Sequence, residues 1–320
     1  MRYLLKRLGH GLLLLFGVSI LSFLFTALAP GNYFDEMKLN PQISPDTVTA
    51  LRARYDVDRP LVLRYGKWLD AVVHGDLGFS FAYDAPAAPL LWARAVNTLI
   101  LTVASTLLAW LIALPLGIWS AERRGGAPDI AISSATAILL IIPDLLLALG
   151  FLLLAVRTGW FPTGGMASVG FAALSWTGKV RDIAAHLALP VTVLTLSTLP
   201  VLVRHVRAAI SSVLGAGYLR AAQAHGVPRR TLLYRYALPA AANPLISLFG
   251  FSIGALLSGS LMVEVVMSWP GLGPLLLEAI QARDLYLVIG GVMLTAVFLA
   301  AGNFIADLLL YWADPRIRQP

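Results

Sequence analysis

The sequence contains no cysteine and carries little charge. The absence of cysteine excludes disulfide bonds and thiolate metal sites. Charged residues make up only 13% of the 320 positions, whereas soluble domains average about 25%. Apolar residues account for 58%, and the mean hydropathy is +0.77. This composition indicates a polytopic membrane protein, in which the bilayer rather than a water-excluded core organises the helices.

Motifs for catalysis and nucleotide binding are also missing. The four lysines are Lys6, Lys38, Lys67 and Lys179, and none completes a GxxxxGK[ST] phosphate-binding loop. The sequence has no GxSxG, no HExxH and no acidic cluster with metal-ligand spacing. The five histidines are scattered. We therefore expect no enzyme activity, no cofactor and no metal site, and any transport must draw its energy from a partner or an ion gradient.

Long apolar runs predict an all-α polytopic membrane protein with six transmembrane helices, because a crossing needs about 20 apolar residues. Gly250 and Gly254 form a GxxxG pair that favours close packing of the fifth span. Pro190 and Pro200 predict kinks in the fourth. The predicted spans are approximately Leu8–Ala29, Val96–Ala121, Ile130–Val156, Ile183–Val203, Pro244–Val266 and Tyr286–Tyr311.

The first apolar run can be interpreted as a signal peptide or as a span. Ala27–Ala29 resembles a signal-peptidase site, but the run is longer than the apolar region of a signal peptide, which has about 7–15 residues. We expect an uncleaved transmembrane helix, and we take residues 1–29 as a first domain.

Residues 30–94 form a long polar segment with seven Lys/Arg and eight Asp/Glu, which we assign to the external side as a second domain. Ser44–Asp46 predicts one helix start, and Pro60 opens a second helix. The second helix carries an apolar stripe through Tyr65 and Trp68. The stripe packs on the outer face of the protein or docks a soluble partner. Residues 95–320 hold the remaining five spans.

Six spans place both termini on one side, and the loop charges indicate which side. The parts assigned to the cytoplasm hold 13 of the 24 Lys/Arg but only four of the 17 Asp/Glu. The stretch Arg204–Arg235 supplies six arginines and no acid. The positive-inside rule therefore predicts cytoplasmic N- and C-termini, and it accounts for the net charge of +7 without nucleic acid. An aromatic belt at the span ends is predicted from Trp119, Trp160, Trp269 and Trp312.

Residues Tyr218–Pro239, called the 218–239 segment below, separate the fourth and fifth spans. Tyr218–His225 predicts a short helix, because alanines favour helices and Gly226 can adopt the left-handed conformation that ends one. Pro228 suits the first turn of a second helix leading to the next span. A compact helix-turn-helix joined to a span can transmit the movement of a soluble partner to the membrane helices.

The spacing of this segment resembles the cytoplasmic EAA loop of importer-type ABC permeases. Ala221, Ala222, Gly226, Leu238 and Pro239 match the pattern, whereas other residues replace its Glu and an aliphatic position. The replacements are Arg220 and Tyr236, and Tyr218-x-Arg220-x-Ala222 resembles the dipeptide/oligopeptide/nickel branch of that family.

Three further motifs resemble the first, or B-type, permease subunit of that branch. His74–Ser80 is similar to its external GDLGxS motif, and Glu264 with Ser268–Gly273 is similar to ExxxSWPGLG. The ending Asp314–Arg318 resembles its DPRIR tail. His225 stands where Lys is usual, and Pro239 stands where this branch often has Arg. These departures leave the solute open, with peptides ahead of nickel, glutathione-like compounds and sugars.

The resemblance implies a type I ABC importer permease fold with a cytoplasmic coupling helix in the inner membrane. It implies a homologous second permease subunit, two ATPase subunits and an external solute-binding protein as partners. The Tyr218–His225 helix would sit in a cleft of the ATPase. Arg220, Arg229 and Arg230 would contact acidic ATPase surface, and the alternative for Arg229 and Arg230 is that they only enforce topology. The residues to which the resemblance gives a coupling role are Tyr218, Arg220, Ala221, Ala222, Gly226, Leu238 and Pro239.

Candidates for the transport pathway are few. Asp144 follows Pro143 and lies at a helix break or lines the pathway. Glu264 is interfacial or borders an outer gate together with Trp269, Pro270 and Gly271. An ion-gradient-driven secondary transporter acting without an ATPase is the alternative function, but such carriers usually bury several ionisable residues. A non-transporting membrane scaffold is a third possibility.

Overall fold

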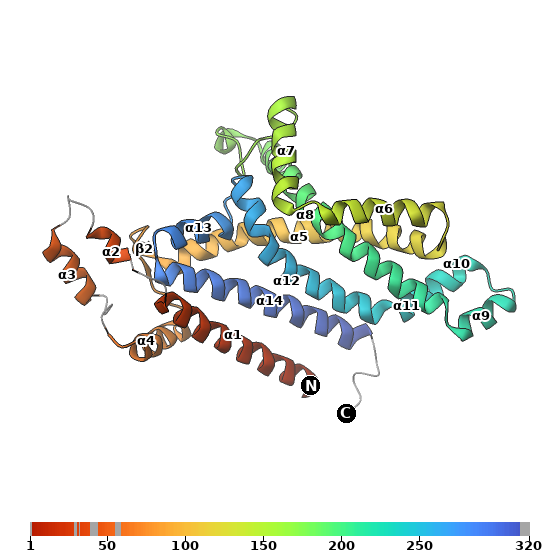
Figure 1. The fold of residues 1–320 in the computed structure, drawn as a ribbon, viewed down its shortest axis with the longest axis horizontal. Helices are drawn as coiled ribbons and strands as arrows, with labels where there is room; N and C mark the ends of the chain where they lie inside the picture. Colours follow the sequence, from red (N-terminus) through yellow and green to blue (C-terminus); the bar gives the residue numbers. More distant parts are fainter. Residues whose placement is uncertain (1, 29–30, 32, 39–43, 55–58, 314–320) are drawn as a thin grey trace. The chain divides into compact units, whose positions relative to one another are not determined.

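The computed structural model describes residues 2–28, 31, 33–38, 44–54 and 59–313, and this part of the chain is helical almost throughout (Figure 1). The predicted DPRIR tail, Asp314–Arg318, lies outside the described residues. The N-terminal half contains α1 (Arg2–Leu28), α2 (Tyr33–Met37), α3 (Pro45–Arg54), α4 (Leu61–Val73), α5 (Ala87–Glu122), α6 (Ala127–Ile141) and α7 (Asp144–Thr158).

The C-terminal half begins with a short 3-10 turn, Phe171–Ala173, and ends with a 29-residue helix. Its helices are α8 (Trp176–Leu214), α9 (Gly217–Ala224), α10 (Arg229–Thr231), α11 (Leu238–Ala240), α12 (Ala242–Val266), α13 (Leu272–Gln281) and α14 (Leu285–Ala313). Leu232–Ala237 forms a π-helix between α10 and α11. Two strands of two residues, β1 (Phe79–Ser80) and β2 (Ala85–Pro86), pair antiparallel, with Phe79 opposite Pro86.

The chain forms two compact units, each of which is described by itself. The first comprises Met1–Thr98 with Pro270–Phe298, and the second comprises Leu99–Trp269 with Leu299–Pro320. In the first unit, Phe23 of α1, Trp68 of α4 and Ile289 of α14 are buried together. The Tyr65 and Ser19 hydroxyls are 2.8 Å apart. The apolar stripe on α4 is thus used for packing within the chain, which supports the first of the two interpretations above.

In the second unit, α8 packs against α6, α7 and α12. The GxxxG pair acts as predicted: a methyl group added at Gly250 would overlap Ala306, and one at Gly254 would overlap Leu299. Only glycine at these two positions lets α12 approach α14 so closely.

Among the described residues, five helices are long and apolar enough to cross a membrane: α1 (through Lys6–Thr26), α5, α8, α12 and α14. The third span predicted over Ile130–Val156 is not one continuous helix. It consists of α6 and α7, which meet at an angle of 95° and together make a sixth, broken crossing or a re-entrant pair. Pro143 explains the break, because it has no amide to donate and holds Ile142 in an extended conformation (ψ 118°).

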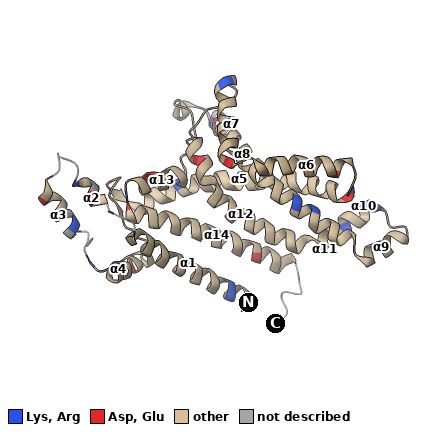
Figure 2. Ribbon diagram, viewed as in Figure 1, with Lys and Arg blue, Asp and Glu red and all other residues tan. Residues whose placement is uncertain are grey.

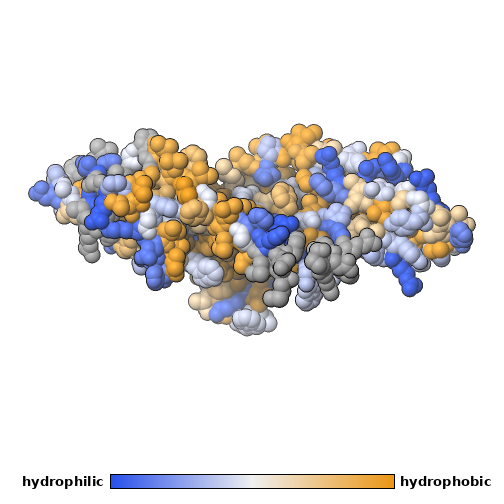
Figure 3. Space-filling model, turned by 90° about the horizontal axis from the view of Figure 1, so that it is seen from below, coloured by the Kyte–Doolittle hydropathy of each residue, from blue (hydrophilic) through white to orange (hydrophobic). Residues whose placement is uncertain are grey.

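The fourth span is longer than predicted, since α8 has 39 residues and runs through Pro190 and Pro200 without interruption. Charged residues are sparse along the long helices (Figure 2), and apolar side chains cover much of the surface seen in Figure 3. Trp119, Trp160 and Trp312 are exposed near helix ends, in agreement with an aromatic belt. Trp269 is wrongly placed in that belt, because it is 0% exposed and belongs to the core.

Candidate functional site

The 218–239 segment has the helix-turn-helix form that its sequence predicts. The Tyr218–His225 helix corresponds to α9, Gly217–Ala224. The second helix is built from α10, the π-helix and α11, and it leads through one residue into α12. Only two residues separate α8 from α9. The segment is therefore tied closely to a membrane helix at each end.

The C-terminal end of α9 is a Schellman motif. Gly226 has φ +83°, and its amide donates to the Gln223 carbonyl at 3.0 Å. The Val227 amide donates to the Ala222 carbonyl at 3.2 Å. Val227 and Ala222 both pack against the same apolar cluster, which supplies the hydrophobic contact usual in this motif. Gly226 thus sets the turn through its conformation, since a methyl group there would meet nothing within 4 Å.

One side of the segment is anchored in the second unit. Leu219, Leu232 and Leu233 are at most 4% exposed and join a cluster with residues of α5 and α8. The other side of α9 is open: Tyr218 is 57% exposed, and Ala221 is also exposed. The segment consequently presents a short helical face on a fixed base.

Two arginines of the segment cap other helices. The Arg220 guanidinium donates to the Gly215 carbonyl from Nε at 3.1 Å and from Nη2 at 2.6 Å, and Gly215 ends α8. Arg229 Nη2 donates to the carbonyl of Glu122, the last residue of α5. Cations are favourable at helix C-termini. Arg220 and Arg229 therefore have roles in positioning the segment, whereas Arg230 is exposed.

The last two coupling candidates lie where the segment joins α12. Leu238 is partly buried against the cluster that holds Leu219. Pro239 lies in the first turn of α11, where proline is tolerated, and it is exposed. All seven residues to which the sequence gives a coupling role thus lie in one continuous stretch of the second unit.

A partly buried ion pair, between Asp129 and Arg207, was not identified from the sequence. Both Asp129 carboxylate oxygens accept from Arg207, at 2.6 Å from Nε and 2.8 Å from Nη2. The Ser120 hydroxyl donates at 2.5 Å and the Gly125 amide at 2.8 Å. These bonds tie the end of α5, the turn that follows and the start of α6 to α8. No local signal identifies Arg207 as the partner, because it is 78 positions away.

The pathway candidates are divided between the two units. Asp144 is the first residue of α7, at the 95° bend, and is exposed. The helix break predicted for it is confirmed, and its role in a pathway stays a prediction. Glu264 is 0% exposed and accepts from the Ser260 hydroxyl at 3.3 Å, so its side chain is enclosed by the protein, and its role at a gate stays a prediction. The Trp269 amide donates to the Glu264 carbonyl at 2.8 Å, which closes the end of α12.

Pro270 and Gly271 belong to the first unit, where they are fixed against α5. The Pro270 carbonyl accepts from Asn97 Nδ2 at 2.8 Å. Gly271 is buried and precedes α13, and the Leu272 amide donates to the Thr98 hydroxyl at 2.8 Å.

Within the part of the chain that the structure describes, no group of three or more His, Asp or Glu residues could hold a metal ion.

Similarity to known sequences covers nearly the whole chain. Residues 113–319 match the family described as "Binding-protein-dependent transport system inner membrane component", and residues 1–106 match its N-terminal companion. The oligopeptide transport system permease protein AppB of Bacillus subtilis is 35% identical over 98% of both chains. The dipeptide transport system permease protein DppB of Escherichia coli K12 is 32% identical over 99% of both.

Similarity to solved structures concerns the fold. A chain of the inward-facing MetNI methionine ABC transporter matches 70% of this chain and 96% of its own length, with a TM-score of 0.54 and 20% identity. A chain of an amino acid ABC transporter matches 70% of this chain and 94% of its own, with a TM-score of 0.51 and 16% identity. The fold is thus that of the membrane subunits of ABC importers.

Proposed function

The chain belongs to the family of binding-protein-dependent transport system inner membrane components, and on this basis we propose that it carries peptides. It is a multi-pass inner-membrane permease subunit of an ATP-driven importer, and it is a transport component rather than an enzyme. An ATPase and a solute-binding protein are its partners in that system. The ion-driven carrier acting alone is the less well supported function.

Peptides are the proposed solute because relatives aligned over nearly the full length are named oligopeptide and dipeptide permeases. The system also depends on a binding protein, which performs much of the selection. The chain itself must then provide a passage that tolerates several peptide side chains rather than a tight pocket for one.

The observation that carries the coupling mechanism is the architecture of the 218–239 segment. It exposes α9 on one side, buries Leu219 and Leu233 on the other, and connects almost directly to α8 and α12. In the proposed mechanism, α9 docks in a cleft of the ATPase, and closure of the ATPases on nucleotide displaces α9. Because its base is packed on α5 and α8, the displacement reaches the membrane helices and switches the opening of the cavity.

The finer assembly is also a proposal. A homologous second permease would form a heterodimer with this chain, and two ATPase subunits would bind on the cytoplasmic side. Both termini and the 218–239 segment would face the cytoplasm, residues 30–94 would face the external binding protein, and lipid would surround the exposed apolar helices. The first span (residues 1–29), the external segment (30–94) and the five-span core (95–320) would be the three functional parts.

The pathway proposal rests on position. Asp144 lies exposed at a break between two apolar helices, which is where a polar group can line a passage. Glu264 and Trp269 are buried at the end of α12, and Pro270 and Gly271 follow them in the sequence; we propose that these four residues border the outer gate.

Reconstitution in liposomes tests the function. The chain would be assembled with its second permease, ATPases and binding protein, and uptake of a labelled dipeptide would be measured with and without ATP. We expect uptake only with ATP, all subunits and the binding protein. Uptake by the isolated chain on a proton or sodium gradient would establish the ion-driven carrier instead. ATPase binding without any solute uptake would point to a scaffold.

The absence of cysteine makes the topology directly measurable. A single cysteine at exposed Gln223 should react with an impermeant maleimide only from the cytoplasmic side, whereas one at Val62, which is 79% exposed, should react from outside. Labelling of Gln223→Cys from outside would contradict the coupling mechanism.

A further inference from the structure

Four parts of the second unit meet at the Asp129 carboxylate. Arg207 of α8 donates to both of its oxygens, at 2.6 Å from Nε and 2.8 Å from Nη2. The Ser120 hydroxyl, near the end of α5, donates at 2.5 Å, and the amide of Gly125, in the turn before α6, donates at 2.8 Å. These four residues, called the Asp129 network below, connect α6 to α5 and α8 through one residue that is 4% exposed.

The 218–239 segment contacts the two helices that the network joins to α6. Arg229 Nη2 donates to the carbonyl of Glu122, the last residue of α5. Arg220 donates twice to the Gly215 carbonyl, at the end of α8. A displacement of the segment would therefore act directly on α5 and α8, and it would reach α6 through the network.

Helix α6 has few other buried residues. Of its 15 residues, all of which the structure describes, only Asp129 and Thr136 are buried. The Thr136 hydroxyl donates to two carbonyls of α6 itself. α6 also packs against α8 (Figure 1), but the hydrophobic effect favours such packing without fixing one position along the helix. The Asp129 network is thus the buried polar connection that sets where α6 lies along α8.

The far end of α6 leads into the bend at Pro143. α6 ends at Ile141, and α7 follows at an angle of 95°. Asp144 is the first residue of α7 and is exposed. Because α7 packs against α8 and α12, a shift of α6 would change the angle at the bend and move Asp144.

The bonding between Asp129 and Arg207 is suited to transmitting a position. A guanidinium that donates from two nitrogens to one carboxylate fixes both the distance and the orientation of the two side chains. Desolvation of a buried ion pair offsets much of the attraction between its charges, although loss of one partner leaves the other charge unpaired. The particular contribution of this pair is therefore its defined geometry.

We propose, on the basis of the function proposed above, that the Asp129 network is a positioning element of the coupling to the ATPase. It makes α6 move together with the C-terminal part of α8, from Pro200 to Leu214, which contains Arg207. Asp129 and Arg207 stay bonded in both states of the importer, while the angle between α6 and α7 changes. Closure of the ATPases would in this way reach the bend at Asp144.

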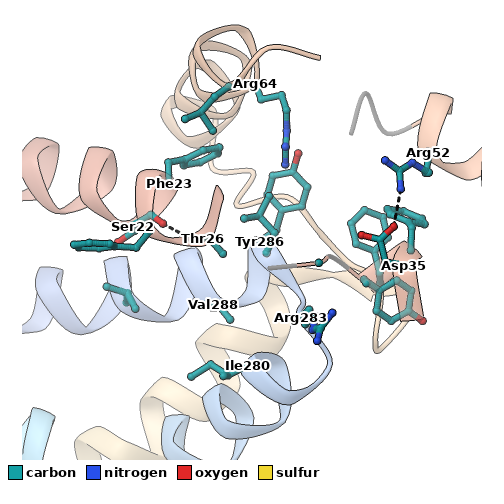
Figure 4. A pocket seen from close by; sticks show the side chains of 18 residues that line it. Ser22, Phe23, Thr26, Asp35, Arg52, Arg64, Ile280, Arg283, Tyr286 and Val288 are labelled. Carbon is teal, nitrogen blue, oxygen red and sulfur yellow. Dashed lines mark hydrogen bonds and ion pairs between the residues drawn. The ribbon is translucent and has the colours of Figure 1, made fainter. Parts of the chain in front are cut away.

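The proposed movement lies within the second unit. The first unit contains a cavity of about 650 Å³, where Phe23 and Thr26 of α1 and Tyr286 of α14 contribute to the lining (Figure 4). Residues of the Asp129 network and of the 218–239 segment are not part of that lining. The proposed movement therefore requires no contact with this cavity.

Distances between pairs of spin labels test the proposal in the importer assembled with cysteine-free partner subunits. The chain has no cysteine, so labels can be attached at chosen exposed positions. With Ser134→Cys on α6 and Ser212→Cys near the end of α8, the distance should stay the same when a non-hydrolysable ATP analogue is added. With Ser134→Cys and Ala184→Cys, which precedes Pro190, the distance should change. A change in the first distance, or none in the second, would overturn the proposal.

Peptide uptake per ATP hydrolysed separates coupling from stability. Arg207→Lys keeps the positive charge but loses the planar fork, and Asp129→Asn keeps the shape but loses the charge. We expect each variant to lower uptake per ATP about fivefold or more, while ATP hydrolysis stays within about twofold of wild type. Asp182→Asn is the matched control, because Asp182 accepts two hydrogen bonds from Ser168 at the other end of α8. It should keep the wild-type ratio.

Each further outcome has a defined meaning. A wild-type ratio in folded Arg207→Lys and Asp129→Asn would show that the pair is only structural. If neither variant folds, the label distances decide, because they are measured with the pair intact. A lack of ATP-dependent uptake by the complete wild-type importer would instead contradict the proposed function itself.

Discussion

The Ser80 hydroxyl donates a hydrogen bond of 2.7 Å to the Asp284 carboxylate across 204 positions of sequence, and both residues are 0% exposed. The same carboxylate oxygen accepts from the Ala82 amide at 3.0 Å. The other oxygen accepts from the Leu287 amide at 3.4 Å, in the first turn of α14. Asp284 therefore caps α14 and holds the β1–β2 hairpin against it.

The hairpin has a second tether in Tyr83, whose hydroxyl donates to the Glu278 carboxylate. Burial, followed by this hydrogen bond, raises the pKa of Tyr83 to about 12. The hydroxyl thus stays protonated at physiological pH and can keep donating.

Removal of the Asp284 carboxylate should loosen the hairpin more than removal of the Ser80 hydroxyl. Asp284→Ala loses three acceptor contacts. Ser80→Ala loses its bond to the carboxylate, which contributes about 1.5–3 kcal/mol, and a weaker bond of 3.2 Å that it accepts from the Tyr83 amide. Limited proteolysis between Phe81 and Asp84 should accelerate strongly in Asp284→Ala and moderately in Ser80→Ala. Equal cleavage rates in the two variants would contradict the capping role.

Gly226→Val should weaken ATPase binding without preventing membrane insertion. Valine at φ +83° is strained by about 1–3 kcal/mol. Either α9 would lose its Schellman motif, or the strain would reduce the free energy of ATPase binding by that amount. ATPase pull-down should fall roughly 5- to 150-fold. Gly217→Val is the matched control, because Gly217 has open space and no positive φ. Unchanged pull-down and transport in Gly226→Val would argue against docking through α9.

Arg220→Ala and Arg230→Ala should impair coupling to the ATPase in different ways. Arg220 fixes α9 on the end of α8 through two hydrogen bonds, so its loss should lower coupled transport at any ionic strength. Arg230 is exposed, and a contact with acidic ATPase surface would be screened by salt. ATPase binding measured between low and high salt should therefore lose part of its salt dependence only in Arg230→Ala. An identical salt response in both variants would remove this distinction.

Asp129→Asn should destabilise the second unit. The substitution leaves the Arg207 guanidinium without a charged partner in a site where Asp129 is 4% exposed. A hydrogen bond to a charged group contributes about 1.5–3 kcal/mol, so the melting temperature in detergent should fall by several degrees. Ser120→Ala removes one of the four bonds to Asp129 and should have a smaller effect. Equal melting temperatures for wild type and Asp129→Asn would show that the pair adds no stability.

Asp144→Asn should leave stability unchanged, because Asp144 is exposed and the bend depends on Pro143. Its effect on transport then reports directly on the pathway. We expect a lower rate for peptides with a positively charged side chain and little change for neutral ones. Equal losses for both classes, or none, would separate Asp144 from the pathway.

Most of the helices follow from the sequence, because apolar length and turn residues are local signals. The second, fifth and sixth spans agree with α5, α12 and α14, and the Tyr218–His225 helix agrees with α9. Position 226 was identifiable because only a residue that tolerates a positive φ can end a helix in this way. A helix break after Pro143 was one of two interpretations of Asp144, but its angle of 95° could not be predicted, since prolines within apolar runs are common and α8 accommodates two of them without interruption.

The contacts between distant residues could not be predicted. Asp129 with Arg207 and Ser80 with Asp284 are paired by the packing of helices, and their sequence separations carry no signal. The burial of Trp269 is similar: a tryptophan beside a span end usually marks the interface, and only the packing of α7, α8 and α12 encloses this one. The role of Arg220 depends on where α8 ends. The end predicted from the sequence, Val203, lies eleven residues before the observed end at Leu214.

The length of α8 has a mechanical consequence. Its 39 residues extend about 58 Å, nearly twice the roughly 30 Å of hydrocarbon that it crosses. Pro190 and Pro200 remove two amide donors near its middle, so the helix is softest there and stiffer toward both ends. In the proposed mechanism, a sideways force on Leu214 would bend α8 between Pro190 and Pro200, and the part of the helix before Pro190 would keep its position. The same helix would then bend near its prolines and move its C-terminal part, from Pro200 to Leu214. This movement would widen or narrow a passage, and the helix would stay folded.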